Sequence, residues 1–392
     1  MLEVADALAI VLEHARPREP RVEPLSSTLL NRIIAIDARA DRDSPPFDKS
    51  LRDGYAVRSA NYGSELLIIE EIAAGKVPTK VVGRGECSRI FTGAPMPEGA
   101  DAVVMQEDTE LHGDLVRILD ASAKPGQWVF PRGAEMKAGD VVIPTGGRLN
   151  PAAIGVLAGI GAAEVRAFPL PRVSVIATGD ELVPVNVQPG PGQIRNSNGP
   201  MLAAQSCNAG AKVQDCGIVR DSESDMIDTI GMALAQSDVL LLAGGVSAGK
   251  YDLVPGILER LGVAAHFHKV RMKPGKPLLF GTFGNTLVFG LPGNPVSAFV
   301  CFELFVRPAL RKLAGEAEPG PLSVLVPLAE AIAEANDRPT YRPATLENGA
   351  VRPLPWAGSP DLRGIARADA LIVLPAGESR LDAGMPVTVI AL

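Results

Sequence analysis

The segment spanning residues 172–314 constrains the fold most, because strand patterns and helix patterns alternate along it. Apolar runs such as RVSVIAT and DVLLLAGG alternate with helical patterns near residues 199–206 and 224–235, and a longer helical pattern covers residues 296–313. Units of this length predict a doubly wound, mostly parallel sheet with helices on both faces. Ligands of such sheets bind at the carboxyl ends of the strands, so a site is expected there.

The flanking regions have different patterns. Helical spacing at residues 4–12 and 29–36 is followed by short strand-like runs broken by Gly and Pro, and NPAAIGVLAGIG then returns to a helix. We therefore expect a helical region with a β-rich lobe inserted at about residues 50–140. After the linker AGEAEPGP, short strand patterns suit a small β-barrel. The expected α/β multidomain chain divides into an N-terminal region, a central α/β domain and a C-terminal barrel, at residues 1–169, 170–315 and 316–392.

The net charge of -7 bears on the partners, because proteins that bind nucleic acid or anionic membranes need a broad basic surface. We expect neither kind of partner, and an anionic ligand would need a local basic pocket. The N-terminal segment MLEVADALAIVLEHARP is acidic, unlike a secretory signal, which predicts a cytoplasmic protein. The four cysteines show no CxxC spacing and predict no disulfide framework.

Two of the predicted strands end in residues that can carry chemistry. RVSVIAT is followed closely by Glu181, whose carboxylate could hold a metal ion or cap the next element, and taken alone the cap is favoured. In LLLAGGVSAGKYD, Gly244 and Gly245 would let backbone amides approach a ligand, or would form a tight turn without one. Ser247 and Asp252 follow in the same segment.

A third predicted strand, TLVFG, ends in LPGNP. Here Asn294 is expected at the N-cap of a helix and Pro295 at its first position, which predicts a rigid ledge formed together with Pro292 and Gly293. Taken alone, these residues are structural. Three such turns at successive strand ends nevertheless indicate a common ligand site.

The run HKVRMKPGKP places four cations within eight residues of an acidic chain. Among them, Lys269, Lys273 and Lys276 could bind a phosphate or another oxyanion, and the alternative is a set of solvated loop lysines. The prolines and the glycine stiffen this loop and favour a site. In the N-terminal region, Asp53 and Thr92 lie on charged or glycine-rich turns that could equally be plain loops.

Taken in order, these segments resemble the molybdopterin molybdenumtransferase family, which includes MoeA and the E domain of gephyrin. The matching runs are FDKSLRDGYAVR, IFTGAPMPEGADAVVMQE, ATGDEL, QIRNSN, GGVSAGKYD, KPGKP and LPGNPVSA. They extend over about residues 45–300, with weaker similarity toward both ends. No single run is specific, but the ordered set is. The resemblance implies that the central domain is of the molybdopterin-binding type.

The resemblance implies an enzyme of molybdenum cofactor biosynthesis. Such an enzyme transfers molybdenum from molybdate to adenylylated molybdopterin, with Mg²⁺-dependent release of AMP. It is implied to be a homodimer whose cleft lies between the central domain of one subunit and the N-terminal lobe of the other, with molybdopterin adenylyltransferase as the upstream partner. The alternatives are a non-catalytic molybdopterin-binding or scaffold paralogue and, less favoured, a phosphate-handling hydrolase that shares only the central domain.

The resemblance also assigns roles by position. Residues implied in catalysis are Asp53, Thr92, Glu181, Asp221 and Asp252, of which Glu181 and Asp252 are the expected Mg²⁺ ligands. The expected binding residues combine those of the turns and the basic run described above with two residues of the C-terminal region. They are Gly244, Gly245, Ser247, Lys269, Lys273, Lys276, Pro292, Gly293, Asn294, Pro295, Arg342 and Ser359. Three departures from the family pattern add positive charge near the expected cleft, and a fourth follows Ser359; they are Lys49, Arg52, Lys250 and Pro360.

Overall fold

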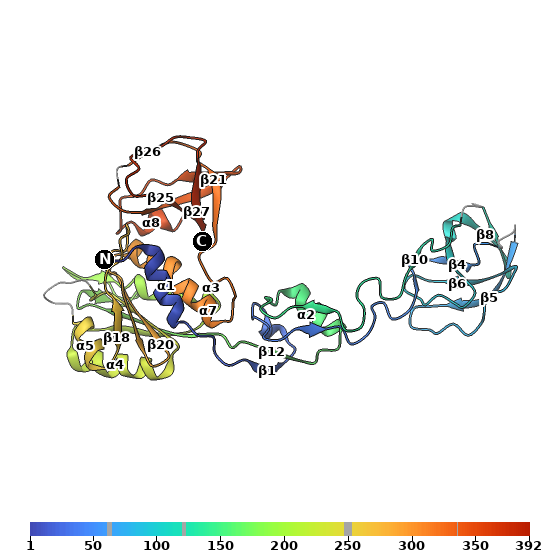
Figure 1. Ribbon diagram of the computed structural model, residues 1–392, viewed down its shortest axis with the longest axis horizontal. Coiled ribbons are helices and arrows are strands. Elements are labelled where there is room, and N and C mark those ends of the chain that lie inside the picture. The colour runs from blue at the N-terminus through green and yellow to red at the C-terminus, as the bar shows by residue number, and fades with distance from the viewer. Residues whose placement is uncertain (61–64, 120–122, 247–252, 335) are drawn as a thin grey trace.

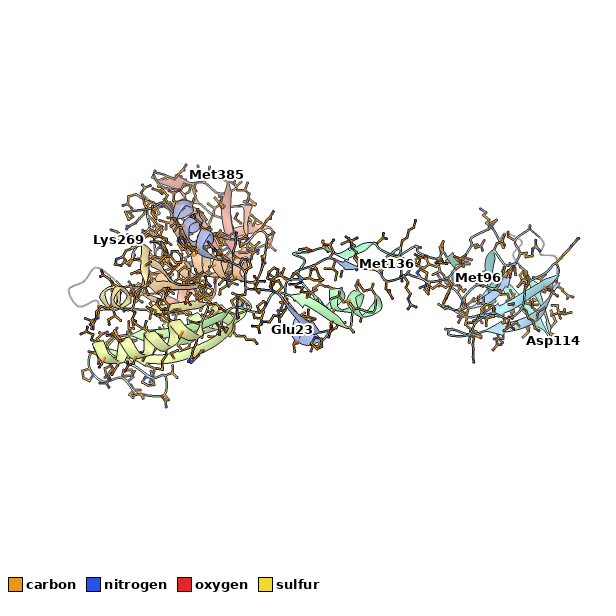
Figure 2. The ribbon with its side chains drawn as sticks, turned by 60° about the horizontal axis from the view of Figure 1, so that its bottom comes forward. Glu23, Met96, Asp114, Met136, Lys269 and Met385 are labelled. Carbon is orange, nitrogen blue, oxygen red and sulfur yellow. The ribbon has the colours of Figure 1, made fainter. Side chains whose placement is uncertain are left out.

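The chain is elongated (Figure 1). A body formed by the central and C-terminal domains stands at one end, a small middle unit follows, and the β-rich lobe lies at the far end. In Figure 2, Glu23 lies in the middle unit, Met136 between that unit and the lobe, and Asp114 in the lobe. This computed structural model describes residues 1–60, 65–119, 123–246, 253–334 and 336–392.

The central domain is built on a six-stranded sheet. The pairings among its first four strands are parallel, and the two pairings at the other edge are antiparallel. In spatial order the strands are β16 (Lys212–Val219), β13 (Arg172–Thr178), β17 (Val239–Ala243), β20 (Thr286–Leu291), β19 (Leu279–Phe283) and β18 (Ala264–Phe267). The predicted mostly parallel sheet is confirmed, and the carboxyl ends of the four parallel strands lie at one edge.

Helices cover both faces of this sheet because apolar side chains along its strands point alternately to either face. In β17, Leu241 belongs to the core that also contains the C-terminal helices of the domain, whereas Leu240 and Leu242 belong to the core on the opposite face. A π-helical stretch, Phe302–Val306, joins two helical segments, so the helix predicted over residues 296–313 is continuous. The helices of this domain are α3 (Asn198–Asn208), α4 (Glu223–Gln236), α5 (Val254–Arg260), α6 (Pro295–Cys301) and α7 (Arg307–Leu313).

The C-terminal domain is the predicted small β-barrel. The two edges of its antiparallel sheet are joined to one another. Leu328 follows the strand at one edge and forms a parallel bridge with Val351, which lies in the strand at the other edge. Ile372 and Val389 lie in its own core, while Tyr341 contributes to the core of the central domain. The elements are β21 (Ser323–Pro327), β27 (Pro386–Ala391), β25 (Ala370–Leu374), β23 (Thr340–Glu347) and β24 (Ala350–Pro353), with the pair β22 (Ile332–Ala333) and β26 (Arg380–Leu381) and helix α8 (Leu362–Ile365).

The first predicted helix is present as α1 (Val4–His14). Its buried side chains, Ala7 and Val11, lie in the core of the central domain, and Leu2 forms a bridge with Val270. Figure 1 shows α1 beside α7, on the side of the sheet that faces the barrel. The helix therefore packs on the body and not with the rest of the N-terminal region, because its apolar stripe completes the larger core.

The helix predicted at residues 29–36 is wrong. Ile33 and Ile34 are both buried, and they form β-bridges with Arg148 and Ala167, respectively. Two consecutive side chains are therefore buried against different partners, which is typical of an extended chain. A helix would bury residues three or four positions apart. The middle unit to which they belong contains η1 (Ser27–Leu29), helix α2 (Pro151–Gly159) and two strand pairs, β1 (Arg21–Pro24) with β12 (Glu164–Ala167) and β2 (Ala38–Arg39) with β11 (Val141–Ile143).

The β-rich lobe contains a six-stranded sheet with a small apolar core on each face. Short strands and glycine turns in the sequence predict this β-rich unit correctly. In spatial order the strands are β7 (Ala102–Met105), β4 (Gly54–Val57), β6 (Glu86–Ile90), β5 (Glu65–Ile72), β9 (Leu115–Ile118) and β8 (Thr109–His112), flanked by β3 (Lys49–Ser50) paired with β10 (Val129–Phe130).

A side chain at Gly54 is expected to destabilise this lobe. A Cβ atom at Gly54 would lie 1.9 Å from the carbonyl oxygen of Val104 in the neighbouring strand, and a backbone atom in a sheet cannot move aside without breaking its pairing. We expect Gly54→Ala to cost about 1–3 kcal/mol of lobe stability, measured as faster hydrogen exchange of lobe amides. Gly155→Ala is the control, because its Cβ would meet no atom within 4 Å. Unchanged lobe exchange in Gly54→Ala would contradict the expectation.

Candidate functional site

The turns that follow β13, β17 and β20 lie against one another at the carboxyl edge of the central sheet. The amide of Gly244 donates to the carbonyl oxygen of Leu291 at 3.1 Å, and the amide of Gly179 donates to that of Val219 at 3.4 Å. A Cβ at Gly293 would lie 3.9 Å from the Cα of Gly244. The glycine-rich turns expected from the sequence are therefore one continuous surface.

Gly244 shows why this edge requires glycine. Its φ is +101°, a conformation that side chains rarely adopt, and a Cβ there would lie 2.6 Å from the carbonyl oxygen of Thr178. The missing side chain lets the turn after β17 close onto the turn after β13. Any larger residue would have to push the two turns apart.

A pocket of about 270 Å³ opens above these turns, and we call it the edge pocket. Glu181 lines it from the turn after β13, Asn294 from the turn after β20, and Asn198 from the start of α3. Asn198 Nδ2 donates to the carbonyl oxygen of Gly293 at 2.7 Å, which fixes the orientation of the amide. Within the described residues, Asn198 Oδ1 and Thr178 Oγ1 are buried without a hydrogen-bond partner. These atoms are available to a polar ligand.

A second pocket of about 260 Å³, the basic pocket, lies where the central domain meets the barrel. Lys273, Lys276 and Arg338 line it together with the hydroxyl-bearing Ser297 and Ser359. No Asp or Glu is among the described residues of its wall. Three cationic side chains and two hydroxyls in one hollow suit an oxyanion, which accepts charge-assisted hydrogen bonds.

The two pockets adjoin at Asn294, which lines both. The residue stands at the N-terminus of α6, but its side chain makes no capping hydrogen bond and Nδ2 instead donates to Ser359 Oγ at 3.1 Å. Pro295 occupies the first turn of the helix, as predicted. The predicted ledge therefore connects the central domain to the barrel and separates the two pockets.

The backbone of Lys273 is bonded to the barrel. Its amide donates to the carbonyl oxygen of Pro339 at 2.9 Å, and its carbonyl oxygen accepts from the amide of Tyr341 at 2.8 Å. This extended contact places Arg338 beside the KPGKP loop. Arg338 was not predicted as a site residue, because only long-range pairing brings it there. Ser297 and Asn198 were also missed, although both lie in the matching runs LPGNPVSA and QIRNSN, which were a signal for them.

Several predicted site residues lie elsewhere. Lys269 lines a separate depression with Leu2 and Phe267 (Figure 2 labels it on the body). Arg342 lies outside the wall of the basic pocket and forms an ion pair with Glu334, with 3.7 Å between Nη1 and Oε2. The amide of Asp221 donates to Asp180 Oδ1 at 3.2 Å, at the same sheet edge as Glu181. The predicted residues Ser247 and Asp252, and the departure Lys250, lie outside the described residues.

Asp53 and Thr92 form a pair within the lobe. Asp53 Oδ1 accepts from the Thr92 amide at 2.7 Å and from Thr92 Oγ1 at 2.8 Å. In this chain the lobe stands at the opposite end from the body (Figure 1), so the structure does not bring the pair to the edge pocket. The two bonds hold the pKa of Asp53 below its usual value, the backbone bond being the larger cause.

Thr92→Val is expected to raise the pKa of Asp53 part of the way toward its ordinary value, because valine keeps the backbone bond and removes the hydroxyl bond. The sign follows from linkage: a lowered folded-state pKa stabilises the lobe above the unfolded value near 3.8, and this is lost as the pH falls through the folded value. An NMR titration of the Asp53 carboxyl carbon measures the change. Thr92→Ser is the control that should keep the low pKa, and identical titrations of Thr92→Val and wild type would rule out the hydroxyl bond.

Two of the residues that depart from the family pattern, Lys49 and Arg52, contact other side chains of the N-terminal region. Lys49 Nζ lies 3.9 Å from Glu135 Oε1, and the guanidinium of Arg52 lies 4.6 Å from the ring centroid of Trp128. Lys49 and Glu135 therefore compensate one another locally. Pro360, a third departure, lines the edge pocket.

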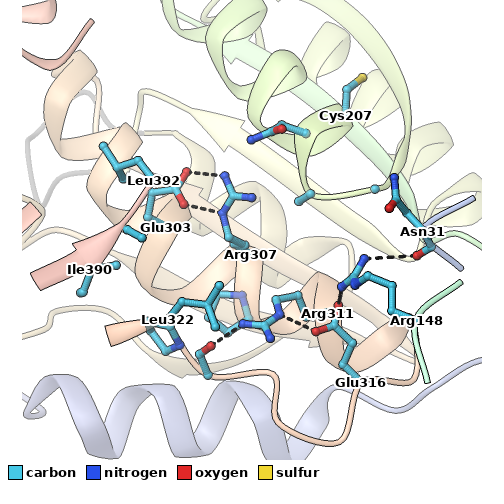
Figure 3. Close-up of a pocket in the computed structure, with 17 residues that line it drawn as sticks. Asn31, Arg148, Cys207, Glu303, Arg307, Arg311, Glu316, Leu322, Ile390 and Leu392 are labelled. Carbon is cyan, nitrogen blue, oxygen red and sulfur yellow. Dashed lines mark hydrogen bonds and ion pairs between the residues drawn. The ribbon is translucent and has the colours of Figure 1, made fainter. Parts of the chain in front are cut away.

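A larger pocket of about 480 Å³ lies where the middle unit, the central domain and the barrel meet (Figure 3). The charged side chains in its wall are paired with one another: Arg307 binds Glu303, and Glu316 binds both Arg148 and Arg311. Arg148–Glu316 links the middle unit to the body, whereas the other two pairs are local to the end of the central domain. Because these side-chain charges already satisfy one another, the pocket is a joint between units and not the candidate site.

Neither a metal cluster nor a membrane span is found in the described part of the chain. Its His, Cys, Asp and Glu side chains form no group of three or more that could hold a metal ion. Its helices are all too short or too polar to cross a bilayer.

Family models match three successive segments of the chain. The MoeA N-terminal region (domain I and II) matches residues 2–161, the probable molybdopterin binding domain matches residues 174–312, and the MoeA C-terminal region (domain IV) matches residues 326–392. Such an ordered set, over a doubly wound sheet with a polar pocket at its carboxyl edge, defines a molybdopterin-binding protein of the MoeA type.

Curated relatives agree with these models. The chain is 38% identical over 377 residues to a molybdopterin molybdenumtransferase of Nostoc sp., with 92% of this chain and 86% of the relative covered. It is also 38% identical over 375 residues to the molybdopterin molybdenumtransferase of a Staphylococcus aureus strain, with 92% and 88% covered. The chain belongs to the molybdopterin molybdenumtransferase family, and the resemblance seen in the sequence is confirmed.

Solved structures show the same architecture. A MoeA protein of molybdopterin biosynthesis from Pyrococcus horikoshii superposes with a TM-score of 0.85 at 28% identity, with all of both chains covered. A second structure of a MoeA protein from that organism gives a TM-score of 0.82 at 30% identity, covering 100% of this chain and 99% of the other. The predicted combination of N-terminal region, central domain and barrel is therefore the fold of MoeA proteins.

Proposed function

We propose that this protein transfers molybdenum from molybdate to molybdopterin, as the names of its relatives indicate, and that its substrate is the adenylylated form, which loses AMP. The observation that carries the proposal is the contact between two unlike pockets at Asn294. One offers amide and hydroxyl groups suited to a heterocycle, and the other offers cations suited to an oxyanion. Binding both substrates side by side converts an encounter of two solutes into a reaction within one complex.

The basic pocket would hold molybdate, and the chemistry of its side chains supports this assignment. Lys273, Lys276 and Arg338 would offset the charge of the oxyanion, while Ser297 and Ser359 would donate hydrogen bonds to its oxygens. The edge pocket would hold the pterin. Its ring system presents N–H donors and a carbonyl acceptor, which match the free Asn198 Oδ1 and Thr178 Oγ1.

Mg²⁺ is the proposed cofactor for release of AMP. The residues present fit this ion, because Mg²⁺ is commonly bound by one or two carboxylates together with substrate phosphates, and Glu181 presents an exposed carboxylate at the edge pocket. Glu181 and Asp252 would hold it. When bound, it neutralises charge that develops on the phosphate oxygens as the phosphoanhydride is hydrolysed.

We also propose that the active unit is a homodimer. Asp53 and Thr92, which the family resemblance implies in catalysis, lie in the lobe at the far end of the chain (Figure 1), so they would reach the edge pocket only from a second copy. A molybdopterin adenylyltransferase would supply the substrate.

The reaction is tested by supplying the purified chain with adenylylated molybdopterin, Mg²⁺ and molybdate, and following AMP and molybdenum-loaded cofactor together. Glu181→Gln should lose AMP release and keep substrate binding, whereas the control Glu259→Gln on α5 should behave as wild type. A wild-type chain that binds the substrate and releases no AMP would favour the scaffold alternative.

The dimer is tested by complementation between two inactive variants. A mixture of Asp53→Asn and Glu181→Gln chains, dissociated and reassembled, should regain part of the activity, because mixed dimers contain one site with both native residues. Either variant alone should remain inactive. Failure of reassembled mixed dimers to regain activity would contradict a site shared between subunits.

A further inference from the structure

We propose that Glu334 is an internal counter-ion that holds Lys273 and competes with the oxyanion for its ammonium group, so that Glu334 sets the affinity of the basic pocket. This inference rests on the proposed function, which assigns that pocket to an oxyanion. Glu334 would act as a positioning residue, because it binds Lys273 and not the oxyanion.

The contact is short and partly enclosed. Lys273 Nζ donates to Glu334 Oε1 at 2.8 Å, and the exposed fractions of the two side chains are 42% and 23%. The second oxygen of the same carboxylate, Oε2, lies 3.7 Å from Nη1 of Arg342. The carboxylate of Glu334 thus contacts both Lys273 and Arg342, in the way that a bound anion would contact them.

Glu334 stands outside the basic pocket, whereas Lys273 is part of its wall. The ammonium of Lys273 is therefore committed to a carboxylate that is not a pocket residue. The other two cations of the wall are placed differently: among the described residues, the ion contact of Arg338 is a longer one, 3.6 Å to the exposed Asp337, and Lys276 is exposed. Of the three, Lys273 alone has an ion pair shorter than 3 Å among the described residues.

Lys273 can exchange partners without movement of the chain. Its backbone is bonded on both sides to the segment before and within β23, through Pro339 and Tyr341. The side chain has four flexible carbons that can turn from Glu334 toward the pocket. Since the ammonium must leave the carboxylate to bind the oxyanion, the ion pair opposes binding.

Removing the competing charge should therefore tighten binding. A partly exposed ion pair is modest in strength, so we expect Glu334→Gln to lower the Kd for molybdate by roughly twofold to fivefold. Glutamine keeps the shape of the side chain and removes its charge. Damage to the fold would weaken binding, so a tighter Kd cannot arise from misfolding.

The experiment is isothermal titration of molybdate alone into the full chain at fixed ionic strength. In a Lys273→Gln background, Glu334→Gln should no longer tighten binding, because the two residues act through one contact. Glu330→Gln is the matched control: this glutamate pairs with Arg352 at 3.2 Å on the same barrel, and its variant should keep the wild-type Kd.

Two outcomes separate this inference from the proposed function. If Lys276→Gln weakens molybdate binding but Glu334→Gln leaves the Kd unchanged or raises it, the pocket assignment stands and the counter-ion role is overturned. If molybdate binds neither wild type nor Glu334→Gln, or binds with no response to Lys276→Gln, the assignment of the basic pocket is overturned, and the inference with it.

Discussion

Arg338→Glu is expected to weaken molybdate binding by at least about 100-fold and to abolish molybdenum transfer at ordinary molybdate concentrations. The variant changes the charge of the basic pocket by two units. A unit charge about 4 Å away contributes about 4 kcal/mol at an effective dielectric constant near 20, and about 1.4 kcal/mol is already tenfold in Kd. The Arg338 side chain is 28% exposed, so water screens only part of this energy.

The geometry of Arg338 supports a direct contact with the oxyanion. The side chain lines the pocket, and its Nε is buried without a hydrogen-bond partner in the described part of the chain, with Asp337 Oδ1 3.6 Å away. Arg338→Lys should bind with intermediate affinity, because it keeps the charge and loses the planar fork.

Arg352→Glu is the control for the change in net charge. Arg352 pairs with Glu330 and Glu347 on the barrel and does not line the pocket, so its variant should bind molybdate within about twofold of wild type. Equal Kd values for Arg338→Glu and wild type in titration calorimetry would exclude Arg338 from the site.

Arg307→Met should destabilise the central domain by about 3–5 kcal/mol, because it leaves a buried carboxylate without its counter-charge. The Glu303 side chain is only 1% exposed, and Arg307 Nη2 donates to its Oε1 at 2.9 Å while Nε donates to Oε2. The remaining partner of this carboxylate, Gln205 Nε2, donates at 2.7 Å but is neutral. Methionine keeps the apolar stem of arginine, so the loss comes mainly from the charge.

The double variant Glu303→Gln/Arg307→Met separates charge from packing. It removes the buried negative charge and keeps an oxygen acceptor for Gln205, so most of the lost stability should return. Calorimetric unfolding, or hydrogen exchange of central-domain amides, measures the free energies. If the double variant is as unstable as Arg307→Met, the loss is due to packing and the explanation by an unpaired charge fails.

The candidate site depends on three segments that are distant in sequence. The strand-end turns supply Glu181, Gly244 and Asn294, the KPGKP loop supplies Lys273, and the barrel supplies Arg338. Small displacements between the central domain and the barrel would therefore alter the basic pocket directly. This explains why Asn294 and Ser359 are hydrogen-bonded to one another across that boundary.

Structural features that depend on short stretches of sequence could be predicted. The alternation of strands and helices over residues 172–314, the apolar stripe of α1 and the N-terminal position of Pro295 follow from local spacing and backbone preference. The turn containing Gly244 was recognisable because only glycine tolerates its conformation. The wrong prediction of a helix at residues 29–36 shows the limit of local patterns. Its two isoleucines form bridges with residues more than 100 positions away in the sequence, and these bridges determine the local structure.

By itself, the sequence determined the family, the order of the domains and the identity of the strand ends that carry polar residues, because periodicity and motif order are local properties. Tertiary structure alone decided that Arg338 and Ser297 share a pocket with Lys273, that Lys269 and Arg342 lie outside it, and that the lobe stands apart from the body. Those placements depend on long-range backbone pairing and on which apolar faces bury one another, and neither is encoded in the spacing of neighbouring residues.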